Sequence, residues 1–199
     1  MIAICVPTNP CTVLFVEDEP TLLELITRQE KRLLERGVLP LYARTFAEAE
    51  SILKSVEVVI IILDLGLHDR KGLDTLESVY ELVKEKETPI YVYTGDDDPE
   101  LRARALECGA TEVFCKGDMP ILYMLTFAHH AANEERKTQT LRNERQFWKD
   151  KAESVEAELN ALKEMVHGLD FGSASNARMK TLENVGRRIE KIQSLVATR

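Results

Sequence analysis

The chain has 199 residues, of which 44% are hydrophobic and 30% charged, a composition typical of a folded protein rather than a disordered one. Its longest apolar run, 58–63, is too short to cross a bilayer, and its four cysteines form no C-x-x-C pair, so we expect a cytoplasmic protein without membrane insertion. Residues 12–118 carry a net charge of −10 and residues 119–199 one of +2, which does not suggest a nucleic-acid partner.

Short apolar runs alternate with amphipathic stretches from residue 12 to residue 116. The apolar runs are 13–16, 39–43, 58–63, 90–93 and 112–115. Uninterrupted runs of this length are typical of parallel strands that are buried on both faces. The stretches between them show helical periodicity, and Gly37 and Gly109 fall where two of these helices should end. The pattern predicts an α/β fold, a doubly wound five-stranded parallel sheet.

The pattern changes to purely helical after Lys116. A helix is expected to start near Ile121 and continue through about 131–170, and a second one is expected over about 178–197, after a stretch rich in glycine and serine. Leu141, Trp148 and later apolar residues recur every seven positions, as in a coiled coil. We therefore predict a first domain over 1–130, with its core in about 12–130, and a helical hairpin or coiled coil over 131–199.

Polar side chains gather at the predicted strand ends. Glu17 and Asp18 follow the first strand, Asp64 the third, Thr94 the fourth and Lys116 the fifth. Loops at the carboxyl ends of parallel strands form the site in doubly wound folds, so these groups should meet. Converging carboxylates repel one another, and oxygen ligands without histidine or cysteine favour Mg²⁺. A metal, a carboxylate, a hydroxyl and a lysine together suit phosphoryl transfer.

Four segments carry a family resemblance, namely "VLFVEDEP", "IIILDLGLHDRKGLDTL", "IYVYTG" and "ALECGATEVFCKG". Over about 12–130 the chain resembles the response-regulator receiver domains of two-component signalling, which have a flavodoxin-like fold. The resemblance implies that Asp64 is the phosphoacceptor and that Glu17, Asp18, Asp64 and the backbone carbonyl of Gly66 hold Mg²⁺. It further implies that Thr94 and Lys116 stabilise the phosphoryl group.

The resemblance also implies a phosphodonor and a narrow range of activity. The phosphodonor would be a sensor histidine kinase or a histidine phosphotransfer protein. No enzyme activity is expected beyond self-phosphorylation from a phosphodonor and slow autodephosphorylation. Two positions depart from the family pattern: Gly117 stands where proline is usual, and Val113 stands where an aromatic residue is usual. Phe114 is adjacent but should point to the opposite face of the sheet, so the readout of phosphorylation is expected to differ.

The helical region favours self-association as the output. A homodimer seam is predicted from Trp148, Val155, Leu159, Leu162 and Val166, although this seam could instead be buried against the chain's own second helix. Two alternatives remain. The sequence from His167 loosely resembles a histidine phosphotransfer pattern, which would make the chain a phosphorelay intermediate. Residues 178–199 carry a charge of +4 and could contact nucleic acid.

Overall fold

The computed structural model describes residues 10–167 and 175–197. The chain divides into two compact units, Met1–Thr138 and Gln139–Arg199, and helix α6 contributes to both. The strands are β1 (Cys11–Val16), β2 (Val38–Ala43), β3 (Ile60–Leu63), β4 (Ile90–Thr94) and β5 (Glu112–Cys115). The helices are α1 (Pro20–Arg28), α2 (Glu30–Glu35), α3 (Phe46–Ser55), α4 (Leu73–Val83), the short 3₁₀ turn η1 (Lys84–Lys86), α5 (Pro99–Glu107), α6 (Ile121–His167) and α7 (Ser175–Ala197).

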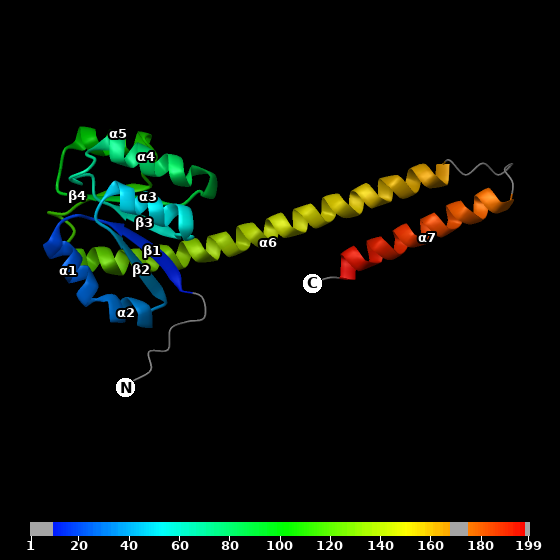
Figure 1. Cartoon of the computed structure of the whole chain (residues 1–199), viewed down its shortest axis with the longest axis horizontal. Helices are drawn as coiled ribbons and strands as arrows, with labels where there is room; N and C mark the ends of the chain where they lie inside the picture. The colour runs from blue at the N-terminus through cyan, green and yellow to red at the C-terminus, as the bar shows by residue number, and fades with distance from the viewer. Residues whose placement is uncertain (1–9, 168–174, 198–199) are drawn as a thin grey trace. The chain divides into compact units, whose positions relative to one another are not determined.

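The first unit is built on one parallel sheet with the strand order β2-β1-β3-β4-β5 (Figure 1). Helices α3, α4 and α5 cover one face, while α1, α2 and the start of α6 cover the other. The predicted doubly wound five-stranded fold is therefore confirmed. Because both faces are covered, β1 and β3 are buried along their whole length, which explains their uninterrupted apolar runs.

Alternate residues of each strand supply the two cores. Leu14 and Ile61 face α3, α4 and α5, while Phe15 and Ile62 face the helices of the opposite side. On that opposite side Met124 of α6 is fully buried. Period-two alternation on a sheet with two buried faces thus splits the hydrophobic residues into two separate clusters.

Two glycines end helices as the sequence predicts. Gly37 has φ of +80° after α2, and Gly109 has φ of +99° after α5, both in the left-handed region that favours glycine. A Cβ atom added to Gly109 would lie 2.4 Å from the Tyr80 ring, so the close approach of α4 also requires glycine there. At the start of α5, Asp98 caps the helix by accepting a hydrogen bond from the Glu100 amide at 2.9 Å.

Some boundaries differ from those predicted. The apolar stripe of residues 22–34 forms two helices rather than one, because the Gln29 amide bonds to the Ile26 carbonyl at 2.9 Å and closes the first helix with a tighter turn. Strand β3 begins at Ile60 instead of residue 58, and β1 begins at Cys11. Helix α7 begins at Ser175, before the predicted position 178, while the predicted end of the preceding helix near 170 lies outside the described residues.

The second unit contains the rest of α6 and helix α7. Glu158 of α6 accepts from the Arg188 guanidinium at 2.6 Å and also from the Lys191 ammonium, so α7 folds back onto α6. The predicted helical hairpin is confirmed. No helix in the described ranges is long and apolar enough to cross a membrane.

Candidate functional site

Backbone hydrogen bonds that continue beyond the strand ends hold the polar residues at one edge of the sheet. The Glu17 amide donates to the Ala43 carbonyl at 2.9 Å, and the Asp64 amide donates to the Val16 carbonyl at 2.9 Å. The Lys116 amide donates to the Thr94 carbonyl at 2.7 Å. The sheet register therefore fixes the positions of these residues, and they gather at the carboxyl ends of the strands as expected.

Three carboxylates converge at this edge. Glu17, Asp18 and Asp64 each offer an oxygen atom, and these atoms lie within 4.8 Å of one another. Asp64 is only 7% exposed and Glu17 only 4% exposed. The Lys116 ammonium contacts Glu17 Oε2 at 2.7 Å and Asp64 Oδ2 at 3.0 Å. The shorter of these two contacts, to Glu17, was not expected from the sequence.

Burial and like charge shift the acidities of this cluster. Burial raises the pKa of Glu17, with a further contribution from the Asp64 carboxylate, and the ammonium of Lys116 opposes both. Burial alone would lower the pKa of Lys116, but its bonds to Glu17 and Asp64 outweigh that effect and raise it. Lys116 is thus held as a cation between two buried carboxylates.

The third carboxylate is held from a different loop. Asp18 Oδ2 accepts a hydrogen bond from the His68 amide at 2.9 Å, and the His68 Nδ1 atom lies 3.1 Å from the same oxygen. Sequence reasoning missed His68. Its position in the loop directly after β3, at the edge where the site forms, was the signal that could have identified it.

Thr94 ends β4 beside β5 and is 4% exposed. Its hydroxyl oxygen accepts a hydrogen bond from the Asp96 amide at 3.3 Å, a contact that leaves the hydroxyl hydrogen unused. Gly66 lies against the Asp64 carboxylate, where an added Cβ atom would come within 3.3 Å of Asp64 Oδ2. Glycine at this position keeps open the space beside the carboxylate, and the predicted role of its carbonyl stays a prediction.

The residues present fit a divalent cation. All three side chains offer carboxylate oxygens, which hard ions such as Mg²⁺ prefer. The cluster has three carboxylates and one ammonium, which contacts Glu17 and Asp64, so it retains an excess of negative charge that a cation would neutralise. The acidic pocket therefore has the donor set and the charge that Mg²⁺ requires.

A comparison with known protein families identifies the domain. The model for the response regulator receiver domain matches residues 13–121, more than half of the chain. The chain belongs to this family. A curated relative, the photosynthetic apparatus regulatory protein RegA of Rhodovulum sulfidophilum, is 32% identical over 108 residues. That match covers 54% of this chain and 56% of RegA, so the chain spans just over half of that relative.

Solved receiver domains share the fold. The non-phosphorylated HemR receiver domain from Leptospira biflexa is 28% identical, with a TM-score of 0.52 over 61% of this chain and 94% of that one. A CheY-like receiver domain protein from Methanospirillum hungatei is 19% identical, with a TM-score of 0.56 over 65% of this chain and 99% of that one. Receiver domains generally bind Mg²⁺ at an acidic pocket, and this chain has an acidic cluster formed by Glu17, Asp18 and Asp64.

The receiver departs from its family around the lysine. Val113 packs into the core on the α3–α5 side, and Phe114 points to the opposite side, where its ring lies 4.8 Å from that of Phe127. The predicted alternation is confirmed. The Lys116–Gly117 peptide is trans, as are the other peptide bonds of the described residues.

A different aromatic residue lies beside the lysine. The ring of Tyr93, which is 3% exposed, has the Lys116 ammonium 5.7 Å from its centroid. The Tyr93 hydroxyl donates to the Met119 carbonyl at 2.8 Å, shortly before α6 begins. Sequence reasoning missed Tyr93, although it directly precedes Thr94 on the strand that carries the site.

The predicted seam of the helical region is only partly covered by α7. Val155 and Leu162 are half-buried, whereas Trp148 and Leu159 are 54% and 45% exposed. The side chain of Val166 lies outside the described residues, as does that of His167, the last residue of α6. The phosphohistidine hypothesis is therefore untested. In the basic segment 178–199, Arg188 and Lys191 are engaged by Glu158, and nucleic-acid contact also stays untested.

Proposed function

We propose that this response regulator accepts a phosphoryl group on Asp64 and signals through protein–protein interaction of its helical C-terminal region. The donor would be a sensor histidine kinase or a histidine phosphotransfer protein, as family membership implies. The observation that carries the proposal is the Asp64 carboxylate, buried among two further carboxylates and bonded to the Lys116 ammonium. This proposal places the work of the domain in the cytoplasm, where such donors act.

The proposed chemistry is a displacement at phosphorus. An oxygen of Asp64 attacks the phosphorus of the donor phosphohistidine, and an O–P bond forms while the N–P bond breaks. The donor nitrogen keeps the electron pair of the broken bond, and the imidazole leaves. Lys116, which already contacts Asp64 Oδ2, neutralises charge on the transferring oxygens, and the hydroxyl hydrogen of Thr94 is available to bond to one of them.

Mg²⁺ is the proposed cofactor. Glu17, Asp18 and Asp64 would hold the ion with the carbonyl of Gly66, and when bound it supplies positive charge that screens the carboxylates from the incoming phosphoryl group. Lys116 provides part of that charge from the protein itself. Beyond this self-phosphorylation and slow hydrolysis of the acyl phosphate, we infer no enzyme activity.

The helical region is proposed to form a homodimer. A hairpin of two helices has little core of its own, and this one leaves large apolar side chains exposed on both helices. They include Trp148 and Leu159 on α6 and, at seven-residue spacing on α7, Leu182, Ile189 and Val196. An apolar groove of about 390 Å³ lies between Trp148, Leu159 and Val196. A second hairpin would cover these surfaces and complete a helical bundle.

The acceptor is tested by Asp64→Asn, which keeps the shape of the side chain but removes the nucleophilic oxygen. Labelling of the full chain by a radioactive small-molecule phosphodonor with Mg²⁺ should be lost. The matched control is Asp74→Asn, because Asp74 is an exposed carboxylate in the first turn of α4. Label that persists in Asp64→Asn at the level of the control would remove Asp64 from this role.

A further inference from the structure

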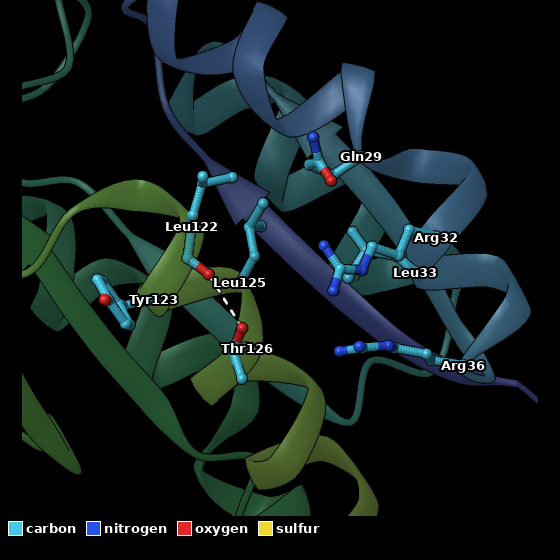
Figure 2. Close-up of a pocket in the computed structure, with 8 residues that line it drawn as sticks. All are labelled: Gln29, Arg32, Leu33, Arg36, Leu122, Tyr123, Leu125 and Thr126. Carbon is cyan, nitrogen blue, oxygen red and sulfur yellow. Dashed lines mark hydrogen bonds between the residues drawn. The ribbon is translucent and has the colours of Figure 1, made fainter.

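A pocket of about 260 Å³ opens between α2 and the first turns of α6 (Figure 2). It lies within the receiver unit and is separate from the acidic site. Its apolar part includes Leu33 of α2 and Leu125 of α6, which are each 4% exposed. Leu122 and Tyr123 also line it and are 56% and 69% exposed. The pocket therefore has a buried apolar floor and an exposed rim.

The α2 side of this pocket is cationic. Arg32 and Arg36 lie one helical turn apart, and Figure 2 shows their side chains and that of Gln29 on the side that faces α6. Other basic residues of α1 and α2 are paired, since Arg28 contacts Glu24 at 2.6 Å and Lys31 contacts Glu35 at 4.0 Å. Neither the Arg32 nor the Arg36 guanidinium has an ion-pair partner among residues 10–167 and 175–197.

Both guanidinium groups are exposed, and no carboxylate of the described residues lies within ion-pair distance of either one. The surrounding segment 12–118 has a net charge of −10, yet two cations of like sign face one small pocket. The charge of Arg36 reaches α6, where the pKa of His129 is lowered first by burial and then by His130 and Arg36. A neutral His129 adds no positive charge near pH 7, so the cationic character of the pocket resides in Arg32 and Arg36.

We propose that this pocket binds a small organic anion, which is a carboxylate, sulfonate or phosphate group on a compact apolar body. A guanidinium presents a planar fork of donors that matches such oxyanions, and the Gln29 carboxamide can add another donor. The apolar body would rest on Leu33 and Leu125. The volume is near the lower limit for ligand pockets and suits a body of one or two rings.

This binding goes beyond the proposed phosphoacceptor function and does not depend on it. Because α2 and α6 both line the pocket, an occupant would link the first turns of α6 to the opposite helix. Bound ligand should therefore slow hydrogen exchange in residues 121–126. Such a ligand would give the receiver an input that is chemically distinct from phosphorylation.

The test uses two naphthalene probes with the full chain. Naphthalene-2-sulfonate carries the anion, and naphthalene-2-sulfonamide is its neutral counterpart of similar shape. Binding is followed by NMR shifts of the Gln29 side-chain amide and of residues 121–126. We expect saturable shifts and an affinity for the sulfonate at least about tenfold higher than that for the sulfonamide, since only the sulfonate forms charge-assisted bonds.

Matched variants test whether Arg32 and Arg36 supply the positive charge that binds the sulfonate. Arg32→Gln with Arg36→Gln should weaken sulfonate binding at least about tenfold, while Arg28→Gln with Lys31→Gln should leave it within about twofold. Each pair removes two positive charges from exposed positions between residues 28 and 36, so a general electrostatic effect would weaken binding equally in both. Equal affinity for the two probes, equal loss in the two variant pairs, absence of binding, or shifts confined to the α6–α7 hairpin would each overturn the proposal.

Discussion

Replacement of Lys116 by methionine is the most direct perturbation of the acidic pocket. The ammonium lies 2.7 Å from Glu17 and 3.0 Å from Asp64, and the three side chains are 18%, 6% and 9% exposed. Methionine keeps most of the apolar volume but leaves two buried carboxylates facing each other. Loss of one member of a buried ion pair typically costs about 3–5 kcal/mol, so we expect the receiver to lose about 3 kcal/mol at neutral pH in chelator.

The loss should depend on pH with a defined sign. Burial already raises the pKa of Glu17 above its ordinary value of 4.5, and removal of Lys116 takes away the group that opposes this rise. A carboxyl group with a raised pKa in the folded state favours the fold at low pH, and that advantage disappears as pH rises through the folded pKa. The difference between Lys116→Met and wild type should therefore shrink as the pH falls toward 4.5.

Urea unfolding of both proteins, at neutral and mildly acidic pH and with either Mg²⁺ or chelator, measures these effects. Mg²⁺ should restore most of the lost stability, because the ion would bring positive charge to the same carboxylates. Combining Glu17→Gln with Lys116→Met should also recover part of it. Lys54→Met is the control, since Lys54 forms an exposed pair with Glu50 and should change stability by about 0.5 kcal/mol or less. A loss insensitive to pH, to Mg²⁺ and to Glu17→Gln would show that Lys116 acts through packing alone.

Three further outcomes are expected. Excess chelator should abolish labelling by a small phosphodonor, with recovery at roughly millimolar Mg²⁺, and equal labelling in chelator would contradict the metal site. Sedimentation of the full chain at roughly tens of micromolar should show a dimer. The double variant Trp148→Glu with Leu159→Glu should sediment as a monomer. The control variant Asn143→Glu with Asn160→Glu should remain a dimer, because these two exposed positions do not line the groove. The pKa of Glu158 is lowered, first by its bond to Lys191. Its contribution to the stability of the hairpin is therefore present above the ordinary pKa of 4.5 and lost as the pH falls through the folded pKa. Faster hydrogen exchange in α7 in acid, reproduced at neutral pH by Glu158→Gln, would verify this.

Much of the receiver was predictable because its sheet is buried on both faces. Burial makes each strand an apolar run, and the polar residue that ends the run then marks the site, as at Asp64 after β3. Period-two alternation likewise predicted that Val113 and Phe114 would enter opposite cores. Such local patterns can be read from the sequence without knowing which residues contact one another in the fold.

The features that the sequence did not predict depend on specific contacts between residues. The break at Gln29 arises from one local hydrogen bond that leaves the apolar stripe of the two helices almost unchanged. The contact of Lys116 with Glu17 and that of His68 with Asp18 join loops from different strands. Which group each side chain contacts depends on its reach in three dimensions, and the spacing of residues in the sequence does not encode that reach.

Tyr93 gives the receiver a physical connection from the acidic pocket to the start of α6, although Val113 is not aromatic. Its buried ring lies beside the Lys116 ammonium, and its hydroxyl donates to the Met119 carbonyl at 2.8 Å. Any movement of Lys116 toward a phosphoryl group would change the surroundings of that ring and, through the hydroxyl, the segment that leads into α6. Tyr93→Phe removes only the hydroxyl and should cost about 1 kcal/mol.

The variant should also speed hydrogen exchange in residues 119–124 and reduce the change in exchange that a phosphodonor causes there. Tyr91→Phe is the matched control, because Tyr91 lies on the same strand and the same face of the sheet as Tyr93, but its ring packs against Phe114 and Phe127. If Tyr93→Phe and Tyr91→Phe respond alike to the phosphodonor, the hydroxyl does not connect the pocket to α6. The response must then pass through the backbone from Lys116 to Met119, where glycine at position 117 leaves the chain freer to move than proline would.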